Sequence, residues 1–209
     1  MSRSSNADRG FFIVLEGIDG AGKTTIARRL VEYFKEKGFT AIYTYEPYDT
    51  LYVRALKQEY AAFRDAYLDG LTYAADRLVH YRSVIRPVLD EGGVVVCDRY
   101  YYSSVAYQAA QGAPPEWVLE INRYAPDPDL AIYLDVDPET GLSRRRGLGT
   151  RFPEYEEVGF LERVRSVYLW MVEKGLLSMV DARRSLEEVY RDILAIIEEK
   201  LGFRASLSS

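Results

Sequence analysis

Residues 17–24 carry the most chemically informative pattern in this sequence. They read Gly-Ile-Asp-Gly-Ala-Gly-Lys-Thr and match the phosphate-binding pattern G-x-x-x-x-G-K-[ST]. Glycines let the backbone turn tightly, so that N–H groups reach phosphate oxygens. A turn that binds no ligand is the alternative, but the complete pattern favours a nucleoside triphosphate site. Its expected members are Gly17, Ile18, Asp19, Gly20, Ala21, Gly22, Lys23, Thr24 and Thr25.

A metal site is expected beside this turn. Lys23 would neutralise the β- and γ-phosphates, and Thr24 would place its hydroxyl on Mg²⁺. Asp98 follows the apolar run Val94–Cys97, at the edge where ligands collect in open α/β sheets. We expect Thr24 and Asp98 to hold Mg²⁺, directly or through water. The alternative for Asp98 is that it caps the segment that follows.

The elements that position these groups alternate along the chain. Short apolar runs predict strands over Phe11–Leu15, Ala41–Tyr45, Val94–Cys97, Leu130–Val136 and Leu176–Val180. Helical spacing predicts helices over Lys23–Lys37, Leu51–Leu68, Leu71–Leu89, Ser104–Gln111, Pro115–Arg123, Pro138–Arg146, Glu156–Lys174 and Leu186–Leu201. Asp69-Gly70 is interpreted as the break between two of them. The alternation predicts a three-layer α/β P-loop NTPase fold, with a five-stranded parallel sheet and helices on both faces.

The composition is that of one globular enzyme-sized domain. The chain has 209 residues and a net charge of -5, which argues against a general nucleic-acid binder. One cysteine excludes an intrachain disulfide, and no apolar run approaches the roughly 20 residues that span a bilayer. We expect a cytoplasmic protein without a membrane segment. Residues 11–203 are expected to form the domain, with flexible tails at 1–10 and 204–209.

Five sequence blocks allow a functional prediction more specific than nucleotide binding. They are LEGIDGAGKTT, EPYDT, YAADR, DRYYYSSVAYQ, and RRRGLGTRF followed by FLERVRSVYL. In this order the chain resembles the thymidylate kinase family of P-loop nucleoside monophosphate kinases, from about Phe12 to Tyr168. The resemblance implies phosphoryl transfer from MgATP to dTMP, giving dTDP and ADP for dTTP biosynthesis. It also implies ATP and dTMP as substrates, Mg²⁺ as cofactor and a homodimer.

The resemblance assigns an acceptor site. Tyr73 and Arg77 lie four residues apart, on one helix face, and are expected to stack on thymine and donate to its O4. Arg99 is expected to bind the acceptor phosphate, since its planar fork suits a phosphate. Asp19 would accept a hydrogen bond from the sugar 3′-hydroxyl. The full expected set is Asp19, Tyr48, Tyr73, Arg77, Arg99, Ser104, Tyr107 and Gln108, with Ser104 and Gln108 at the base edge and Tyr107 crowding the 2′ position.

A basic segment is expected to be the lid over ATP. Residues 144–154 begin with three arginines and contain two glycines, which suit a loop that closes. Family members with glycine at the Gly20 position carry their catalytic arginine in this lid. At least one of Arg145, Arg146 and Arg151 is therefore expected to reach the transferring phosphoryl group. The expected catalytic set is Asp19, Lys23, Arg99, Arg145, Arg146 and Arg151.

One segment departs from the family pattern. Residues 45–50 read Tyr-Glu-Pro-Tyr-Asp-Thr, where many bacterial members read Arg-Glu-Pro-Gly-Gly-Thr. Tyr48 could donate to the acceptor phosphate, but Asp49 adds negative charge unless it faces away. Two alternatives to a dTMP kinase stay open. One is a kinase for another acceptor, such as dUMP, dGMP or a deoxynucleoside; the other is a non-enzymatic nucleotide-binding protein, although the guanine signature Asn-Lys-x-Asp is absent.

Overall fold

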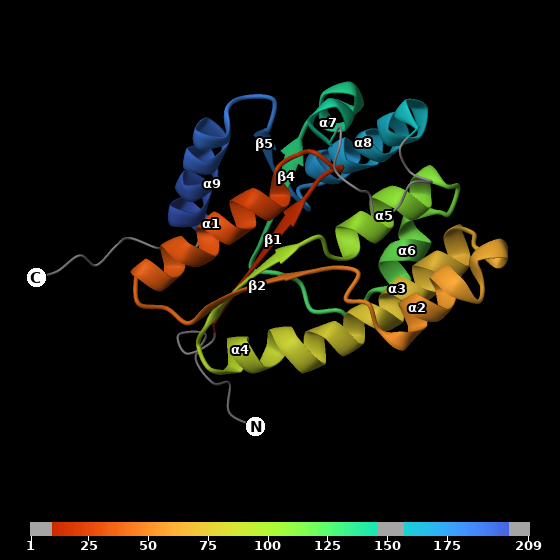
Figure 1. The fold of residues 1–209 in the computed structure, drawn as a ribbon, viewed down its shortest axis with the longest axis horizontal. Coiled ribbons are helices and arrows are strands. Elements are labelled where there is room, and N and C mark those ends of the chain that lie inside the picture. The colour runs from red at the N-terminus through yellow and green to blue at the C-terminus, as the bar shows by residue number, and fades with distance from the viewer. Residues whose placement is uncertain (1–9, 146–156, 201–209) are drawn as a thin grey trace, which may run out of the picture.

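The computed structural model describes residues 10–145 and 157–200, and in them a five-stranded parallel sheet forms the centre (Figure 1). Its strands are β1 (Phe11–Glu16), β2 (Ala41–Tyr45), β3 (Val94–Asp98), β4 (Leu130–Asp135) and β5 (Ser178–Asp181), in the order β2-β3-β1-β4-β5. Every residue of β3 and β4 is buried, as expected for strands covered on both faces. The predicted α/β fold is confirmed.

The register of the sheet brings the strand ends together. Leu15 of β1 lies opposite Asp98 of β3, and Glu16 lies opposite Tyr133 of β4. Tyr45 of β2 also lies opposite Asp98. The loops that leave β1, β2 and β3 therefore start from one edge, which is where ligands bind in open α/β sheets.

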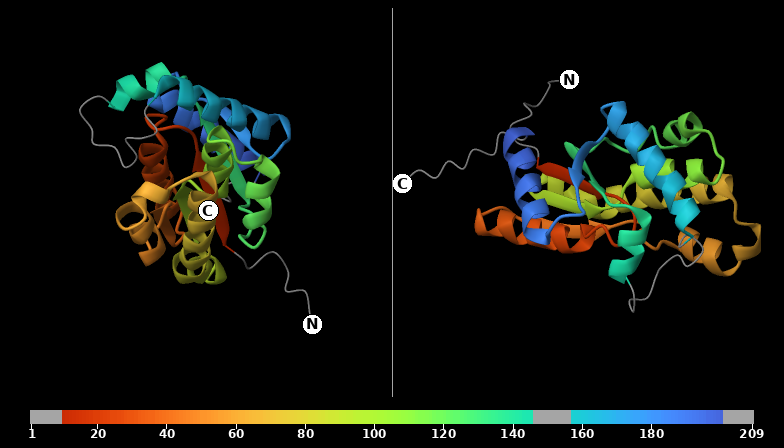
Figure 2. Two further views of the ribbon diagram at one scale, coloured as in Figure 1. Left: turned by 90° about the vertical axis from the view of Figure 1, so that its right-hand side faces the viewer. Right: turned by 90° about the horizontal axis from the view of Figure 1, so that it is seen from above.

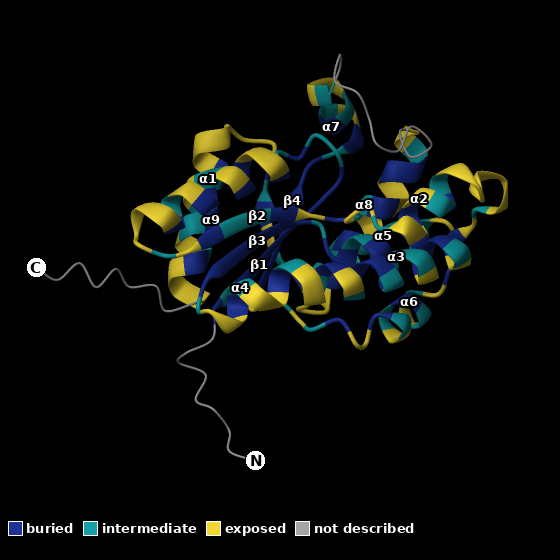
Figure 3. Cartoon of the chain, turned by 60° about the horizontal axis from the view of Figure 1, so that its bottom comes forward, coloured by how far each residue is buried: buried dark blue, intermediate teal, exposed yellow. Residues whose placement is uncertain are grey.

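Helices cover both faces of the sheet. Along the chain they are α1 (Lys23–Glu36), α2 (Leu51–Gln58), α3 (Ala66–His80), α4 (Arg86–Asp90), α5 (Tyr101–Ala110), α6 (Pro115–Ile121), α7 (Pro138–Arg145), α8 (Val158–Glu173) and α9 (Leu186–Lys200). Figures 1 and 2 show α1 and α9 side by side on one face, with α5 and α8 on the other. Figure 3 shows that the buried residues concentrate in the sheet and on the inner sides of the helices. None of the described helices has the length and apolarity that crossing a membrane requires.

The predicted helix break at Asp69-Gly70 is wrong, because α3 runs through both residues. The helix begins after Asp65, whose carboxylate accepts from the backbone N–H groups of Tyr67 and Leu68 at 2.9 and 2.7 Å. A Cβ at residue 70 would lie 3.1 Å from the Trp117 ring of α6. The glycine thus permits close packing between α3 and α6 instead of ending a helix.

Smaller differences follow from local geometry. The predicted helix at residues 71–89 contains a π-helical turn, Tyr81–Ile85, before α4. The helix after β3 begins at Tyr101, three residues before the predicted start at Ser104. Both predicted tails fall largely outside the described residues. So does most of the predicted lid, including Arg146 and Arg151, since α7 is described only to Arg145.

Candidate active site

The phosphate-binding turn joins the end of β1 to the start of α1. Gly20 and Gly22 have φ angles of 83° and 91°, in the region that favours glycine. Lys23 is buried, and its ammonium donates to the Ile18 carbonyl at 2.9 Å. Burial, followed by the positive charge of Arg99, lowers the pKa of Lys23. A pocket opens here, lined by Asp19, Gly20, Gly22, Lys23, Thr24, Thr25, Arg28, Tyr43, Tyr45, Glu46, Asp98, Arg99, Arg144 and Arg145.

Thr24 and Asp98 meet at the base of this pocket, as the metal prediction requires. The Thr24 hydroxyl donates to Asp98 Oδ2 at 2.5 Å, and Lys23 Nζ lies 4.0 Å from Asp98 Oδ1. Across residues 10–145 and 157–200, no three histidine, cysteine or acidic side chains gather into a metal cage. Mg²⁺ is commonly held by one or two protein oxygens together with substrate phosphates. A hydroxyl beside a carboxylate, next to a phosphate-binding turn, fits that ion.

Asp19 is the centre of a charge cluster. Arg99 Nη2 donates to Asp19 Oδ1 at 2.6 Å, Arg145 pairs with Oδ2, and Lys23 Nζ lies 4.0 Å away. Burial alone would raise the pKa of Asp19, but Arg99, Lys23 and Arg145 together hold it below its ordinary value. Three cations from α1, α7 and the end of β3 therefore converge on one carboxylate. A phosphate arriving here would find the positive charge already assembled.

Arg99 reaches this cluster through an unusual backbone conformation. Its φ is 74°, which non-glycine residues rarely adopt and which is characteristic of functional sites. Its Nη1 donates to Ser103 Oγ at 3.1 Å, and Ser103 Oγ donates to Glu16 Oε2 at 2.6 Å. Glu16 also accepts from the Tyr100 backbone N–H at 2.7 Å and the Tyr168 hydroxyl at 2.8 Å. This buried carboxylate thus orients the segment that carries Arg99.

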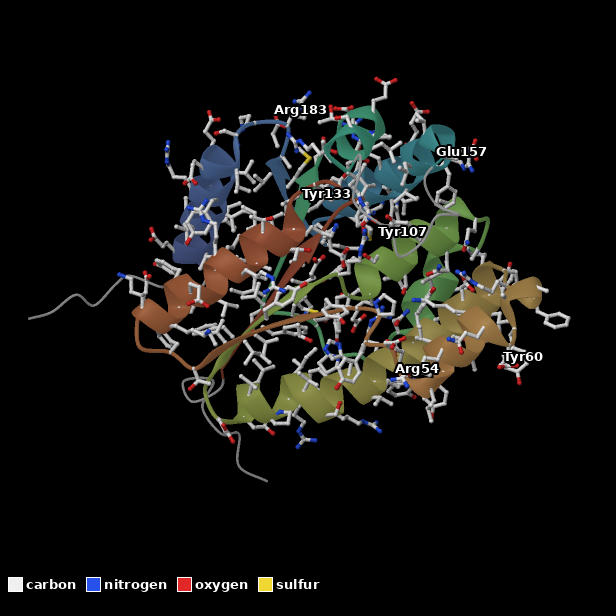
Figure 4. The ribbon with its side chains drawn as sticks, in the orientation of Figure 1. Arg54, Tyr60, Tyr107, Tyr133, Glu157 and Arg183 are labelled. Atoms are coloured by element: carbon white, nitrogen blue, oxygen red, sulfur yellow. The ribbon has the colours of Figure 1, made fainter. Side chains whose placement is uncertain are left out.

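A second pocket adjoins the first. Seven of the eight predicted acceptor residues line it, all except Tyr48: Asp19, Tyr73, Arg77, Arg99, Ser104, Tyr107 and Gln108. Asp19, Glu46 and Arg99 line both pockets, so they form the boundary between them. Tyr107 of α5 lies toward α8, where its ring centre is 6.1 Å from that of Phe160 (Figure 4). The pocket lined by the residues expected to bind the base thus lies directly beside the phosphate pocket.

Arg77 is buried and held by three partners. It donates to Glu46 Oε2 at 2.7 Å through Nε, to Asn122 Oδ1 at 2.5 Å through Nη1, and to Ser104 Oγ at 3.1 Å through Nη2. A guanidinium has five N–H donors, so this network leaves donors for a ligand. Arg77 is therefore fixed in orientation before any base arrives.

Glu46 is shared between Arg77 and His80. Its second oxygen, Oε1, lies 3.1 Å from His80 Nδ1, and the other ring nitrogen lies 2.7 Å from Thr44 Oγ1. Both Glu46 and His80 are buried. The chain Thr44–His80–Glu46–Arg77 links β2 to α3 beneath the base pocket.

Gln108 presents a buried acceptor to the same cavity. Its Oε1 has no hydrogen-bond partner within the part of the chain that the structure describes. Such a group costs stability unless a ligand satisfies it. An N–H on the edge of a pyrimidine would do so.

Residues 45–50, which differ from the pattern of many bacterial family members, place Asp49 outside both pockets. Arg54 Nε donates to Asp49 Oδ2 at 3.2 Å, and both side chains are more than half exposed. Asp76 fixes the loop by accepting from the backbone N–H groups of Tyr48 and Thr50 at 2.7 and 3.0 Å. The Tyr48 ring stacks on His80, with centres 4.7 Å apart. The Asp49 charge is thus kept from the phosphate pocket, and a contact of Tyr48 with phosphate stays a prediction.

Gly20 and Gly141 explain how an arginine of α7 reaches Asp19. A Cβ on Gly20 would lie 2.1 Å from the Gly141 carbonyl oxygen, and a Cβ on Gly141 would lie 2.7 Å from the Asp19 carbonyl oxygen. No side chain fits at either position while the two backbones touch. The contact sets α7 against the phosphate-binding turn, with Arg145 four residues further along the helix.

We expect Gly141→Ala to lower kcat by about 10²-fold, because displacements near 1 Å have effects of that size on positioned catalytic groups. MgADP affinity should stay near the wild-type value, since the turn itself is retained. Gly159→Ala is the matched control, because its Cβ would come no closer than 3.5 Å to Glu157 Oε1. Steady-state kinetics of both variants test this, and a wild-type kcat for Gly141→Ala would show that Arg145 does not depend on the contact.

Several supporting residues were not singled out from the sequence. Glu46 lies in the block EPYDT and Asp76 in the block YAADR, but no sequence pattern predicted their partners. In the structure Glu46 accepts from Arg77, and Asp76 accepts from the Thr50 backbone N–H. Asn122 carries no sequence signal, because α6 brings it to Arg77 only through packing. Gly141 carries no sequence signal either, because its role depends on close contact with residues 18–20, which are distant in the sequence.

Comparison with known proteins is consistent with this geometry. A family model described as thymidylate kinase matches residues 15–193. The chain is 65% identical over 196 residues to a probable thymidylate kinase from Staphylothermus marinus, covering 94% of this chain and 98% of that protein. Probable thymidylate kinases from Pyrococcus abyssi and Pyrobaculum calidifontis are 42% and 41% identical, covering 92% and 91% of this chain and 98% and 97% of theirs.

Proposed function

Since the chain belongs to the thymidylate kinase family, we propose that it transfers the γ-phosphoryl group of MgATP to dTMP, giving dTDP and ADP for dTTP synthesis. One observation carries this proposal beyond family membership. The phosphate pocket and the pocket lined by Tyr73, Arg77 and Gln108 share Asp19, Glu46 and Arg99 as lining residues. This arrangement lets two nucleotides face each other across a single boundary.

The acceptor needs no general base. A phosphate monoester has a second pKa of about 6, so it is largely ionised at neutral pH and is already a nucleophile. The difficulty is that two polyanions must approach in line. Lys23, Arg99 and Arg145 supply the neutralising charge, and Asp19 holds them in place until the phosphates arrive.

Thr24 and Asp98 would hold Mg²⁺, directly or through water. When bound, the ion supplies charge neutralisation of the β- and γ-phosphate oxygens. The 2.5 Å pairing of the Thr24 hydroxyl with Asp98 gives these two groups a common position beside Lys23.

Arg77 and Gln108 set the base preference. Arg77 donates and cannot accept, so it favours a base with a carbonyl group at position 4 and disfavours cytosine, which carries an amino group there. The Gln108 Oε1 acceptor suits the ring N–H of thymine or uracil. Tyr73 lines the same cavity, where its ring would stack on the base.

Asp19 and Tyr107 would contact the sugar of the acceptor nucleotide and distinguish deoxyribose from ribose. The Tyr107 hydroxyl lies 3.4 Å from Arg99 Nη2, so the ring stands between the base cavity and the phosphate boundary. In that position it would crowd a 2′-hydroxyl and disfavour ribonucleotides. Asp19, which shares Arg99 Nη2 with Tyr107, would accept from the 3′-hydroxyl.

We also propose that the protein is a homodimer. Large apolar side chains on and between α2 and α3 face outward: Leu51 is 76% exposed, Phe63 72% and Leu71 53%. Large exposed apolar side chains mark a protein interface where they are contiguous. Light scattering in solution should give a mass twice that of one chain.

An acceptor panel tests the proposed function. Purified protein is assayed with MgATP and dTMP, dUMP, dCMP, dGMP or ribothymidine monophosphate. We expect dTMP to give the highest kcat/KM, dUMP to be accepted less well, and dCMP and the ribonucleotide to react poorly. Turnover of dGMP without dTMP or dUMP would overturn the assignment of Arg77 and Gln108.

A further inference from the structure

Two arginines of the phosphate pocket have no part in the proposed mechanism: Arg144, which donates to the backbone carbonyls of Ala182 and Arg183, and Arg28. Arg28 lies in α1, four residues after Thr24, and therefore shares a helix face with it. It lines the pocket together with Tyr43, Tyr45 and Asp98. Its guanidinium lies over the Tyr43 ring, 4.8 Å from the ring centre.

The acidic side chains of this pocket already have other partners. Asp19 pairs with Arg99 and Arg145, Glu46 pairs with Arg77, and Asp98 accepts from Thr24. Within residues 10–145 and 157–200, no carboxylate pairs with Arg28. The residue is a cation in a phosphate pocket, held by an aromatic face that leaves its N–H groups free to donate.

The position of Arg28 points to the acceptor. In the proposed function the turn at residues 17–24 and Lys23 hold the donor phosphates. Arg28 lies instead on the β2 side of the pocket, with Tyr43 and Tyr45, and Glu46 follows directly at the boundary with the base cavity. Arg99 approaches the same boundary from the end of β3. Arg28 and Arg99 line the same pocket, so an acceptor phosphate bound in it could contact both.

We propose that Arg28 is a second binding residue for the phosphate of the acceptor nucleotide, positioned by the ring of Tyr43. The inference rests on the proposed function and extends it. Tyr45 stands where many bacterial family members carry an arginine, so this side of the site lacks that charge. Arg28 restores a guanidinium to it from a different element.

Binding measurements that compare dTMP with thymidine test the inference, because the two ligands differ only in the phosphate. Calorimetry is performed on the wild type, Arg28→Ala and Arg29→Ala. We expect Arg28→Ala to weaken dTMP binding by about 10- to 100-fold, the range for a lost charge-assisted hydrogen bond, and to leave thymidine and MgADP binding within about twofold. Tyr43→Leu should weaken dTMP binding by about two- to fivefold, because the guanidinium loses its support.

Arg29→Ala is the matched control. Arg29 is the next residue of α1, but it pairs with Glu187 of α9 and stacks over Tyr190, away from the pocket. Its loss should leave all three affinities unchanged. Unchanged dTMP binding in Arg28→Ala, equal weakening of dTMP and thymidine, or weakening of MgADP alone would overturn the inference. A wild type that binds neither dTMP nor thymidine would instead overturn the proposed function, and the inference with it.

Discussion

Replacing Arg145 with alanine is expected to lower kcat by about 10³–10⁵-fold, the range measured for arginines that stabilise the transition state of phosphoryl transfer. Arg145 pairs with Asp19 at the boundary of the two pockets, and the Gly20–Gly141 contact holds its helix there. The KM for dTMP should change much less than kcat, because the charge acts mainly on the phosphoryl group in transit. Steady-state kinetics at saturating MgATP separate the two parameters.

Arg144→Ala is the control for this experiment. Arg144 directs its donors to the backbone carbonyls of Ala182 and Arg183, at 2.8 and 3.1 Å, and so anchors α7 to the segment after β5. Its loss should lower kcat by less than about tenfold. Arg146 and Arg151 are tested in the same way. Wild-type kcat in Arg145→Ala, Arg146→Ala and Arg151→Ala alike would contradict a catalytic arginine in this region.

Replacing Glu46 with glutamine is expected to lower the free energy of unfolding by about 3–5 kcal/mol, because it leaves Arg77 as a buried charge without its ionic partner. Both side chains are almost fully buried, and Nε of Arg77 lies 2.7 Å from Glu46 Oε2. The same change should weaken dTMP binding while MgADP binding is kept, since Arg77 loses its fixed orientation. Urea denaturation and calorimetry measure the two effects.

Asp49→Asn supplies the comparison on the same loop. It removes one partner of the Asp49–Arg54 pair, in which both side chains are more than half exposed. Pairs of that kind contribute less than about 1 kcal/mol. If Glu46→Gln is no less stable than Asp49→Asn, the buried network does not hold Arg77 as proposed.

Features encoded within short segments could be predicted from the sequence. The turn at residues 17–24 joins β1 to α1, and the apolar strands lie where they were predicted, because both depend on local spacing. Thr24 and Asp98, both expected at the metal site, lie within hydrogen-bond distance, because parallel strands bring their carboxyl ends to one edge. Tyr73 and Arg77 line one cavity because residues four apart share a helix face.

Features that depend on contacts between distant segments could not be predicted. Asp69-Gly70 resembled a break, whereas the glycine in fact accommodates Trp117 of α6. Asn122 meets Arg77 across 45 positions of the chain, and no periodicity encodes such a meeting. The direction of Asp49 depended on Arg54 and on a φ of 70° at Asp49 itself. Each of these is a property of packing.

The most direct test of the central claim follows the phosphoryl group itself. ATP labelled in its γ-phosphate is incubated with Mg²⁺, dTMP and the purified protein, and the products are separated by chromatography. The proposed function predicts label in dTDP, formed in equal amount to ADP, and none when Mg²⁺ is chelated. Label that appears only in inorganic phosphate, or that never leaves ATP while dTMP is present, would contradict the claim that the two pockets bring donor and acceptor together.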